Sequence, residues 1–162
     1  MSDFAAATRS HYDVLAPTYN QFLSSFSQRV VPALDRLLLG QLPGGASVLD
    51  VCCGTGQLAS ELTKRGLLVT GVDLSAGMLS FARQNAPKAE FLQADVCTMT
   101  LPREFDAAVS TFDSLNHLPD RNSLAACFRN VASCLKPGGG FLFDLNMQTG
   151  FELRWWGRAQ LA

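Results

Sequence analysis

The chain has 162 residues and carries 13 lysines and arginines against 14 aspartates and glutamates, for a formal net charge of −1. This length suits one domain with a substantial core, and the hydrophobic content of 48% is that of a globular protein. No basic block or stripe occurs, which argues against a nucleic-acid partner held through its phosphates. The apolar stretches are short and interrupted, so we expect neither a signal peptide nor a membrane span.

Five cysteines stand at positions 52, 53, 97, 127 and 134, with no Cys-x-x-Cys spacing. Adjacent Cys52 and Cys53 are poorly placed to share a common metal cage, so we expect no metal site. Unpaired cysteines are often buried, and they persist in reducing compartments. The sequence therefore predicts free thiols in a cytoplasmic protein.

The first 40 residues are expected to be helical. Val30, Val31, Leu34, Leu37 and Leu38 recur at helical spacing and are predicted to share one apolar face. Pro17 is expected to separate an amino-terminal arm from the helix that follows. Glycines and a proline at positions 40 and 43–45 end this region.

Strands and helices then alternate to residue 145. We expect strands at 46–51, 67–72, 90–94, 105–111 and 141–145, and helices at 58–62, 76–84 and 121–135. Gly66 ends the first helix, Ser75 caps the second, and the run Lys136-Pro-Gly-Gly-Gly140 ends the third. This order predicts an α/β fold with an open, doubly wound, mostly parallel sheet of about five strands. We expect one domain over 1–162, with an N-terminal helical arm (1–43), a core (44–147) and a tail (148–162).

A glycine-containing turn follows the first strand, in the run Val48-Leu-Asp-Val-Cys-Cys-Gly-Thr-Gly-Gln57. Gly54 and Gly56 permit positive φ and let the backbone approach a ligand. The helix behind them offers unpaired amides to a carboxylate or phosphate. A turn of this kind fits a nicotinamide-cofactor site as well.

Three acids follow successive strands, at the edge where open α/β sheets bind ligands. Asp50 would repel a pyrophosphate but attract the ammonium of an amino acid; the alternative is a turn-capping role. Asp73 stands where a carboxylate accepts from ribose hydroxyls, or else caps a helix. Asp95 can accept from an adenine amino group, with Val96 offering its amide to a ring nitrogen, although Asp is also common in loops.

Four stretches, in order, resemble class I S-adenosylmethionine-dependent methyltransferases over roughly residues 10 to 150. Val48 to Gly56 is similar to the glycine-rich first motif, Gly71-Val-Asp-Leu-Ser75 to the ribose motif, and Gln93-Ala-Asp-Val96 to the adenine motif. The run at 136–140 is similar to the turn before strand five. Cys52 replaces the first glycine of the usual turn, as in some members that methylate quinones. The resemblance implies a Rossmann-like fold, S-adenosylmethionine as methyl donor with S-adenosylhomocysteine as product, and a small-molecule acceptor.

The resemblance also implies site residues. The arm Tyr12-Asp-Val-Leu-Ala-Pro-Thr-Tyr19 is similar to that of small-molecule members, whose second tyrosine often closes over the amino-acid end of the cofactor; the alternative is simple packing on the domain. The residues implied for cofactor binding are Tyr19, Asp50, Cys52, Gly54, Gly56, Asp73, Leu74, Met78, Asp95, Val96 and Thr111. His117 and Asp113 are candidate general bases, and His117 is equally well interpreted as a surface loop residue. No Asn-Pro-Pro-Tyr-like stretch follows strand four, which argues against methylation of nucleic-acid bases.

Two other functions stay open at this point. One is a chain that binds S-adenosylmethionine without turnover. The other is an NAD-dependent oxidoreductase, disfavoured because a GxGxxG run is missing and Asp50 sits where pyrophosphate would lie. Family members usually continue with two more strands, but this chain ends 17 residues after Leu145. We therefore expect truncation after strand five, an open sheet edge, and a possible homodimer through strand five or the tail with Trp155 and Trp156.

Overall fold

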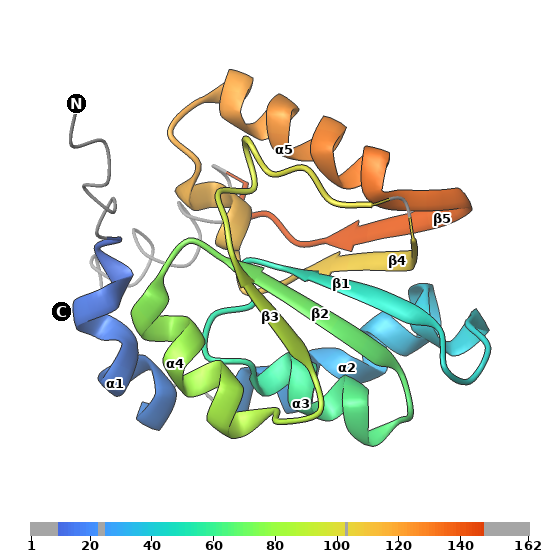
Figure 1. Cartoon of the computed structure of the whole chain (residues 1–162), viewed down its shortest axis with the longest axis horizontal. Coiled ribbons are helices and arrows are strands. Elements are labelled where there is room, and N and C mark those ends of the chain that lie inside the picture. Colours follow the sequence, from blue (N-terminus) through green and yellow to red (C-terminus); the bar gives the residue numbers. More distant parts are fainter. Residues whose placement is uncertain (1–9, 23–24, 103, 148–162) are drawn as a thin grey trace, which may run out of the picture.

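A five-stranded parallel sheet forms the centre of the computed structural model, which describes residues 10–22, 25–102 and 104–147 (Figure 1). The strands lie in the order β3-β2-β1-β4-β5, and every neighbouring pair is parallel. Their bounds are β1 Ser47–Val51, β2 Leu68–Asp73, β3 Glu90–Gln93, β4 Phe105–Ser110 and β5 Leu135–Phe143. The predicted open α/β fold is confirmed, and the first four strands lie within two residues of their expected positions.

Helices cover both faces of the sheet (Figure 1). Alternation along β1 sets the two layers, because Val48 and Leu49 point to opposite faces. Val48 packs in a core cluster with residues of α2 and α3, whereas Leu49 packs in a cluster with residues of α5. The helix bounds are α1 Tyr12–Phe22, α2 Ser25–Leu37, α3 Gln57–Lys64, α4 Ala76–Asn85 and α5 Arg121–Cys134, with short 3-10 turns at Leu39–Gln41 and Ser114–His117.

The predicted cap of α4 is confirmed. Ser75 Oγ accepts a hydrogen bond from the Met78 amide at 3.1 Å, and the inward residues Met78, Leu79 and Ala82 are buried. Gly66, which follows α3, takes the left-handed φ of +83° expected of a helix-ending glycine. No helix in the described part of the chain is both long enough and apolar enough to cross a membrane.

Two expectations for the amino-terminal region were wrong. Pro17 lies inside α1 rather than at its boundary. A proline there removes one backbone hydrogen bond, and α1 nevertheless continues to Phe22. Leu37 is 57% exposed, whereas Val31 and Leu34 are buried. Six residues at 3.6 per turn put Leu37 about 120° around the helix from Val31, off the apolar face.

The expected boundary between α5 and strand five was also wrong. The run 136–140 lies within β5, which begins at Leu135 directly after α5 and ends at Phe143 rather than residue 145. Leu135 pairs with Phe105 and Gly140 pairs with Ala107, so five steps along β5 oppose two along β4. The intervening residues bulge away from the ladder, with Gly138 at a φ of +84°. Glycines that resemble a helix stop thus form an irregularity inside a strand.

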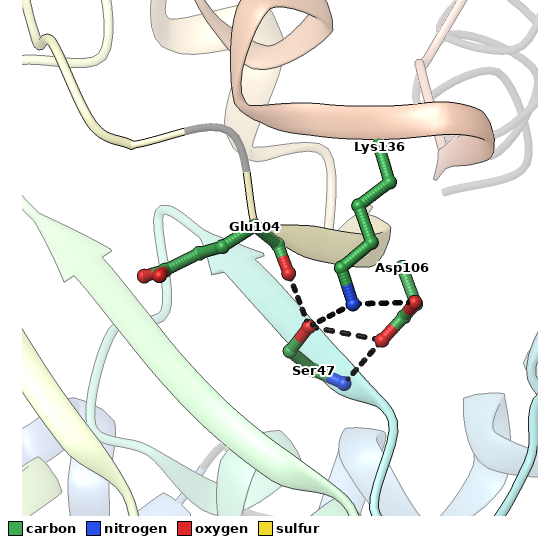
Figure 2. A network of polar contacts seen from close by, with 4 residues as sticks. All are labelled: Ser47, Glu104, Asp106 and Lys136. Atoms are coloured by element: carbon green, nitrogen blue, oxygen red, sulfur yellow. Dashed lines mark hydrogen bonds and ion pairs between the residues drawn. The ribbon is translucent and has the colours of Figure 1, made fainter.

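A polar network joins the amino ends of β1, β4 and β5, as Figure 2 shows. The Asp106 carboxylate accepts from Lys136 Nζ at 2.8 Å, from the Ser47 amide at 2.8 Å and from Ser47 Oγ at 2.9 Å. The Ser47 hydroxyl also lies 2.5 Å from the Glu104 carbonyl oxygen. The Lys136 hydrogen bond, followed by those from Ser47, lowers the pKa of Asp106 to about 2. These bonds connect three strands at their amino ends, and the candidate site lies at the carboxyl ends.

Candidate functional site

Acidic residues gather where β1, β2 and β3 end. Asp50 is the penultimate residue of β1, Asp73 is the last residue of β2, and Asp95 follows β3 by two positions. Asp50 pairs in register with Gly71, and Asp73 pairs with Gln93. Parallel strands place their carboxyl ends along one boundary of the sheet, here called the carboxyl edge. The predicted grouping of the first two acids at this edge is observed.

Three residues of the turn after β1 adopt the left-handed backbone conformation. Cys52, Gly54 and Gly56 have φ values of 59°, 53° and 78°. Cys52 therefore takes the conformation that glycine adopts most easily, at a cost of about 1–2 kcal/mol. The turn is held by hydrogen bonds from the Cys53 amide to the Val72 carbonyl at 3.0 Å and from the Gly56 amide to the Cys53 carbonyl at 3.1 Å.

Two glycines near the turn are required by close packing. A Cβ at Gly56 would lie 2.8 Å from Ala82 Cα in α4, so this position lets the start of α3 approach α4. A Cβ at Gly71 would lie 2.7 Å from the Phe91 ring and 2.8 Å from Cys53 Sγ. At Gly54, by contrast, the nearest atom is Tyr19 Cε1 at 3.7 Å.

Asp50 is a buried carboxyl group with an unsatisfied oxygen. Its side chain is 2% exposed, and Oδ2 has no hydrogen-bond partner within the described residues. Burial, followed by the negative charge of Asp73, raises the pKa of Asp50 to about 8. Buried polar atoms are normally paired, so this oxygen is suited to a donor or cation supplied by a ligand.

Asp73 ties the turn after β1 to the start of α4. Its Oδ2 accepts from the Gly54 amide at 2.9 Å, and its Oδ1 accepts from the Ser75 amide at 2.9 Å. Burial raises the pKa of Asp73, while these amide hydrogen bonds oppose the shift. Each carboxylate oxygen has two lone pairs, so the group retains acceptor capacity beyond its structural bonds.

The other residues implied for cofactor binding differ in their surroundings. Asp95 is exposed, and its Oδ1 accepts from the Cys97 amide at 2.8 Å, which is a local turn contact. Val96 and Met78 are buried, Thr111 is half-buried, and Leu74 is 42% exposed. The contact of Asp95 thus agrees with its loop interpretation, and a role toward a ligand stays a prediction.

Helix α1 brings two tyrosines to the same edge of the sheet. Tyr19 lies against Gly54 and packs edge-on to Phe112, with ring centres 5.9 Å apart. Burial, then the charges of nearby acids and Tyr12, raises the pKa of Tyr19. The Tyr12 hydroxyl lies 3.3 Å from His117 Nδ1 and 3.2 Å from Nε2. The structure therefore brings Tyr12 and His117 together, although the sequence analysis assigned Tyr12 no role.

The loop after β4 holds both candidate bases. Phe112 and Asp113 have positive φ values of 66° and 49°. The Asp144 carboxylate accepts from both of their amides, at 3.1 and 3.0 Å. Asp113 Oδ2 accepts from Asn146 Nδ2 at 2.5 Å. This loop is therefore shaped by residues that follow β5, which sequence reasoning did not connect with it.

Sequence reasoning missed three further residues at this edge. Ser110, the last residue of β4, is buried, and its Oγ has no partner within the described part of the chain. Asp13 and Asn20 bond α1 to the start and end of α4. A signal existed for α1, because Tyr12 and Tyr19 are seven residues apart and share a helix face. No group of three or more metal-binding side chains occurs in the residues that the structure covers.

Comparison with known proteins identifies the family. Residues 48–139 match the family model described as a methyltransferase domain, and the chain belongs to this family. The matched segment contains the turn after β1 together with Asp50, Asp73 and Asp95. The family resemblance inferred from the sequence is confirmed.

The similar proteins include several methyltransferases. A putative methyltransferase of Bacillus subtilis is 42% identical over 109 residues, covering 65% of this chain and 44% of its own length. A Streptomyces venezuelae dTDP-amino-sugar N,N-dimethyltransferase is 38% identical over 103 residues, covering 64% and 44%. Thus the chain spans less than half the length of both.

Solved structures give the same result. Streptomyces venezuelae DesVI is 33% identical with a TM-score of 0.69, covering 85% of this chain and 58% of its own. An amino pentose methyltransferase from Micromonospora echinaspora, solved with S-adenosylmethionine bound, is 28% identical with a TM-score of 0.71, covering 83% and 56%.

Gly56→Ala is expected to destabilise the protein more than Gly66→Ala. Both glycines have left-handed φ, so each substitution costs about 1–2 kcal/mol. Only the Cβ at position 56 meets backbone atoms, whereas that at position 66 meets open space. We expect Gly56→Ala to cost a further 1–3 kcal/mol or so, measured by urea unfolding. Equal costs would contradict the packing between α3 and α4.

Asp50→Asn is expected to flatten the dependence of stability on pH. The folded protein holds the Asp50 proton up to about pH 8, while the unfolded carboxyl loses it near pH 4 or so. The folded state therefore binds more protons between these values, and stability falls by about 1.4 kcal/mol per pH unit as pH rises.

The measurement is the free energy of unfolding at pH 5.5 and pH 8, in roughly the middle and upper part of that window. Asp106→Asn is the control, because the pKa of Asp106 is about 2 and lies below the window. Asp106→Asn should change the free energy of unfolding without changing how steeply it depends on pH. The same slope in the parent and in Asp50→Asn would mean that Asp50 ionises normally.

Proposed function

We propose that the protein is an S-adenosylmethionine-dependent methyltransferase that acts on a small-molecule acceptor. The observation that carries the proposal is the buried carboxyl of Asp50, whose Oδ2 has no partner among the described residues and lies at the end of β1 beside the glycine turn. An amino acid ammonium would satisfy this oxygen and favour its ionised form. A dinucleotide pyrophosphate would instead oppose ionisation of Asp50, because two negative charges would then lie side by side.

The residues at the edge of the sheet fit S-adenosylmethionine part by part. Asp50 would hold the ammonium and Asp73 the ribose hydroxyls, while the turn of Cys52, Gly54 and Gly56 leaves room for the ligand against the backbone. Asp95 and Val96 would bind the adenine. Tyr19 would cover the amino-acid end, and the remaining proposed contacts are Leu74, Met78 and Thr111. Support comes from related structures described as bound to S-adenosylmethionine or S-adenosylhomocysteine.

In the proposed reaction the protein positions the reactants and does not need to activate the methyl group. When bound, S-adenosylmethionine supplies a methyl group that its sulfonium charge has already activated. The protein must align the acceptor and exclude water, and a base helps if the acceptor loses a proton. We propose that His117, whose ring lies beside the Tyr12 hydroxyl, is the base that accepts this proton. Asp113 is the second candidate, although its carboxylate is engaged by Asn146.

The acceptor is proposed to be a small metabolite rather than a nucleic acid. Related proteins bear names that specify dTDP-amino sugars or ubiquinone biosynthesis, and the net charge of −1 gives no attraction for phosphate backbones. The five free cysteines suit a reducing compartment, which supports a cytoplasmic location.

Asp73→Ala is expected to weaken S-adenosylhomocysteine binding about 30- to 1000-fold, which is about 2–4 kcal/mol. A carboxylate that bridges two ribose hydroxyls makes two charge-assisted hydrogen bonds. Asp95→Ala should cost less, because its carboxylate is exposed. Calorimetry measures both, and thermal unfolding in parallel separates lost ligand contacts from a loosened turn.

Two results would contradict these assignments. An Asp73→Ala variant that binds S-adenosylhomocysteine within about threefold of the parent would refute the ribose assignment. The same calorimetry with NAD tests the function itself. A parent protein that binds NAD but not S-adenosylhomocysteine would refute the methyltransferase proposal.

A homodimer through strand five is expected in solution. β5 is an outer strand of the sheet within the described residues, and the outer edge of such a strand can pair with another chain. The tail, with Trp155 and Trp156, lies outside the described residues. Sedimentation at low micromolar concentration should reveal a concentration-dependent dimer. A monomer at every concentration would refute the assembly.

A further inference from the structure

A carboxylate of α1 caps α4, which begins 63 residues further along the chain. Asp13 Oδ1 accepts from Ser75 Oγ at 2.5 Å and from the Gly77 amide at 3.0 Å. Ser75 Oγ in turn accepts from the Met78 amide. Two amides of the first turn of α4, which a helix leaves without internal partners, are thus bonded to Asp13 and Ser75. Asp13 therefore caps α4 from another helix.

Gly77 makes this approach possible. A Cβ at position 77 would lie 2.9 Å from both Asp13 Cα and the Asp13 carbonyl oxygen. Because these are backbone atoms, they cannot move without shifting α1. Glycine inside a helix is otherwise unfavourable relative to alanine. Gly77 thus makes α4 less stable as an isolated helix, but it provides the space in which α1 docks.

The other end of α1 is also held by polar side chains. Asn20 Oδ1 accepts from Gln57 Nε2 at 2.8 Å and from Asn85 Nδ2 at 2.7 Å. Gln57 begins α3 and Asn85 ends α4, and Asn85 also donates to the Thr55 carbonyl at 2.7 Å. These two sets of contacts hold Tyr12 beside His117 and Tyr19 against Gly54.

Apolar burial in α1 is confined to Ala16 and the half-buried rings of Tyr12 and Tyr19. Ala16 is the buried residue of α1, whereas Val14, Leu15 and Phe22 are 85%, 52% and 67% exposed. Segments with few buried apolar contacts open at low free energy. Within the described residues, α1 is therefore held by a few hydrogen bonds and two ring contacts, and none of its residues belongs to the core clusters.

We propose that Asp13 is a positioning residue that closes α1 over the turn 52–56, and that the cofactor enters and leaves when the bonds from Asp13 to α4 open. The cofactor part rests on the proposed function. Asp13 acts through Tyr12 and Tyr19, which the closed helix presents to the site. The contacts lie within the chain, so closure itself needs no ligand.

Three variants separate this role from a general loss of stability. Asp13→Ala removes the acceptor, while Asp13→Asn keeps a side-chain oxygen and should retain most of the contact. Gly77→Ala leaves Asp13 intact but blocks docking, although alanine favours the helix itself. Ser80→Ala is the matched control, because Ser80 is an exposed residue of the same helix.

Hydrogen exchange in the full chain without ligand tests the closure. Asp13→Ala and Gly77→Ala should raise amide exchange in α1 by about tenfold, which corresponds to about 1.4 kcal/mol, with β1 and β4 unchanged. Asp13→Asn and Ser80→Ala should behave like the parent. Unchanged exchange in α1 in both disruptive variants would overturn the proposal.

Stopped-flow binding of S-adenosylhomocysteine tests the gate. Both the association and the dissociation rate should rise at least about threefold in Asp13→Ala and Gly77→Ala, because an opened helix eases entry as well as exit. A rise in dissociation alone would indicate lost contacts and overturn the gating role. If the parent does not bind S-adenosylhomocysteine, the proposed function fails, while the exchange measurement still decides whether Asp13 holds α1.

Discussion

The carboxylate of Asp73 is the interaction on which the rest of the site depends. One oxygen holds the Gly54 amide of the turn after β1, and the other holds the Ser75 amide before α4. The two loops between which a ligand would lie are therefore set by one side chain. Ser75 also donates from its hydroxyl to Asp13, so Asp73 orients one of the two points at which α1 is attached. Burial raises the pKa of this carboxyl, and the amide hydrogen bonds, which favour its charged form, oppose that rise.

The amino ends and the carboxyl ends of the strands differ in how their polar groups are paired. At the amino ends, Asp106 has charged and neutral donors around it and a pKa of about 2, so its bonds persist at ordinary pH (Figure 2). At the carboxyl ends, Asp50 Oδ2 and Ser110 Oγ are buried with no partner in the described residues. Unsatisfied buried polar atoms lower stability. The molecule thus concentrates its unpaired groups at the edge where open α/β sheets bind ligands.

Backbone strain gathers at the same edge. The non-glycine residues with positive φ in the described ranges are Cys52, Phe112 and Asp113, and they lie in the turns after β1 and β4. Such conformations persist where the surrounding structure enforces them. Here the Asp144 carboxylate bonds the amides of Phe112 and Asp113. Residues beyond β5 therefore help to shape the loop that carries the candidate bases.

The sequence by itself determined the order of elements, the parallel sheet, the glycine turn and the methyltransferase family. These depend on local patterns: apolar runs, glycines at turns, Ser75 before a helix and acids at strand ends. The tertiary structure alone decided that Pro17 continues a helix, that the run 136–140 lies inside β5, and that α1 is joined to α4 through Asp13 and Asn20. In the last two cases the deciding contacts join distant segments, such as Gly140 with Ala107 or Asp13 with Gly77. A local pattern states what a segment prefers, whereas packing against a distant partner determines which preference is overridden.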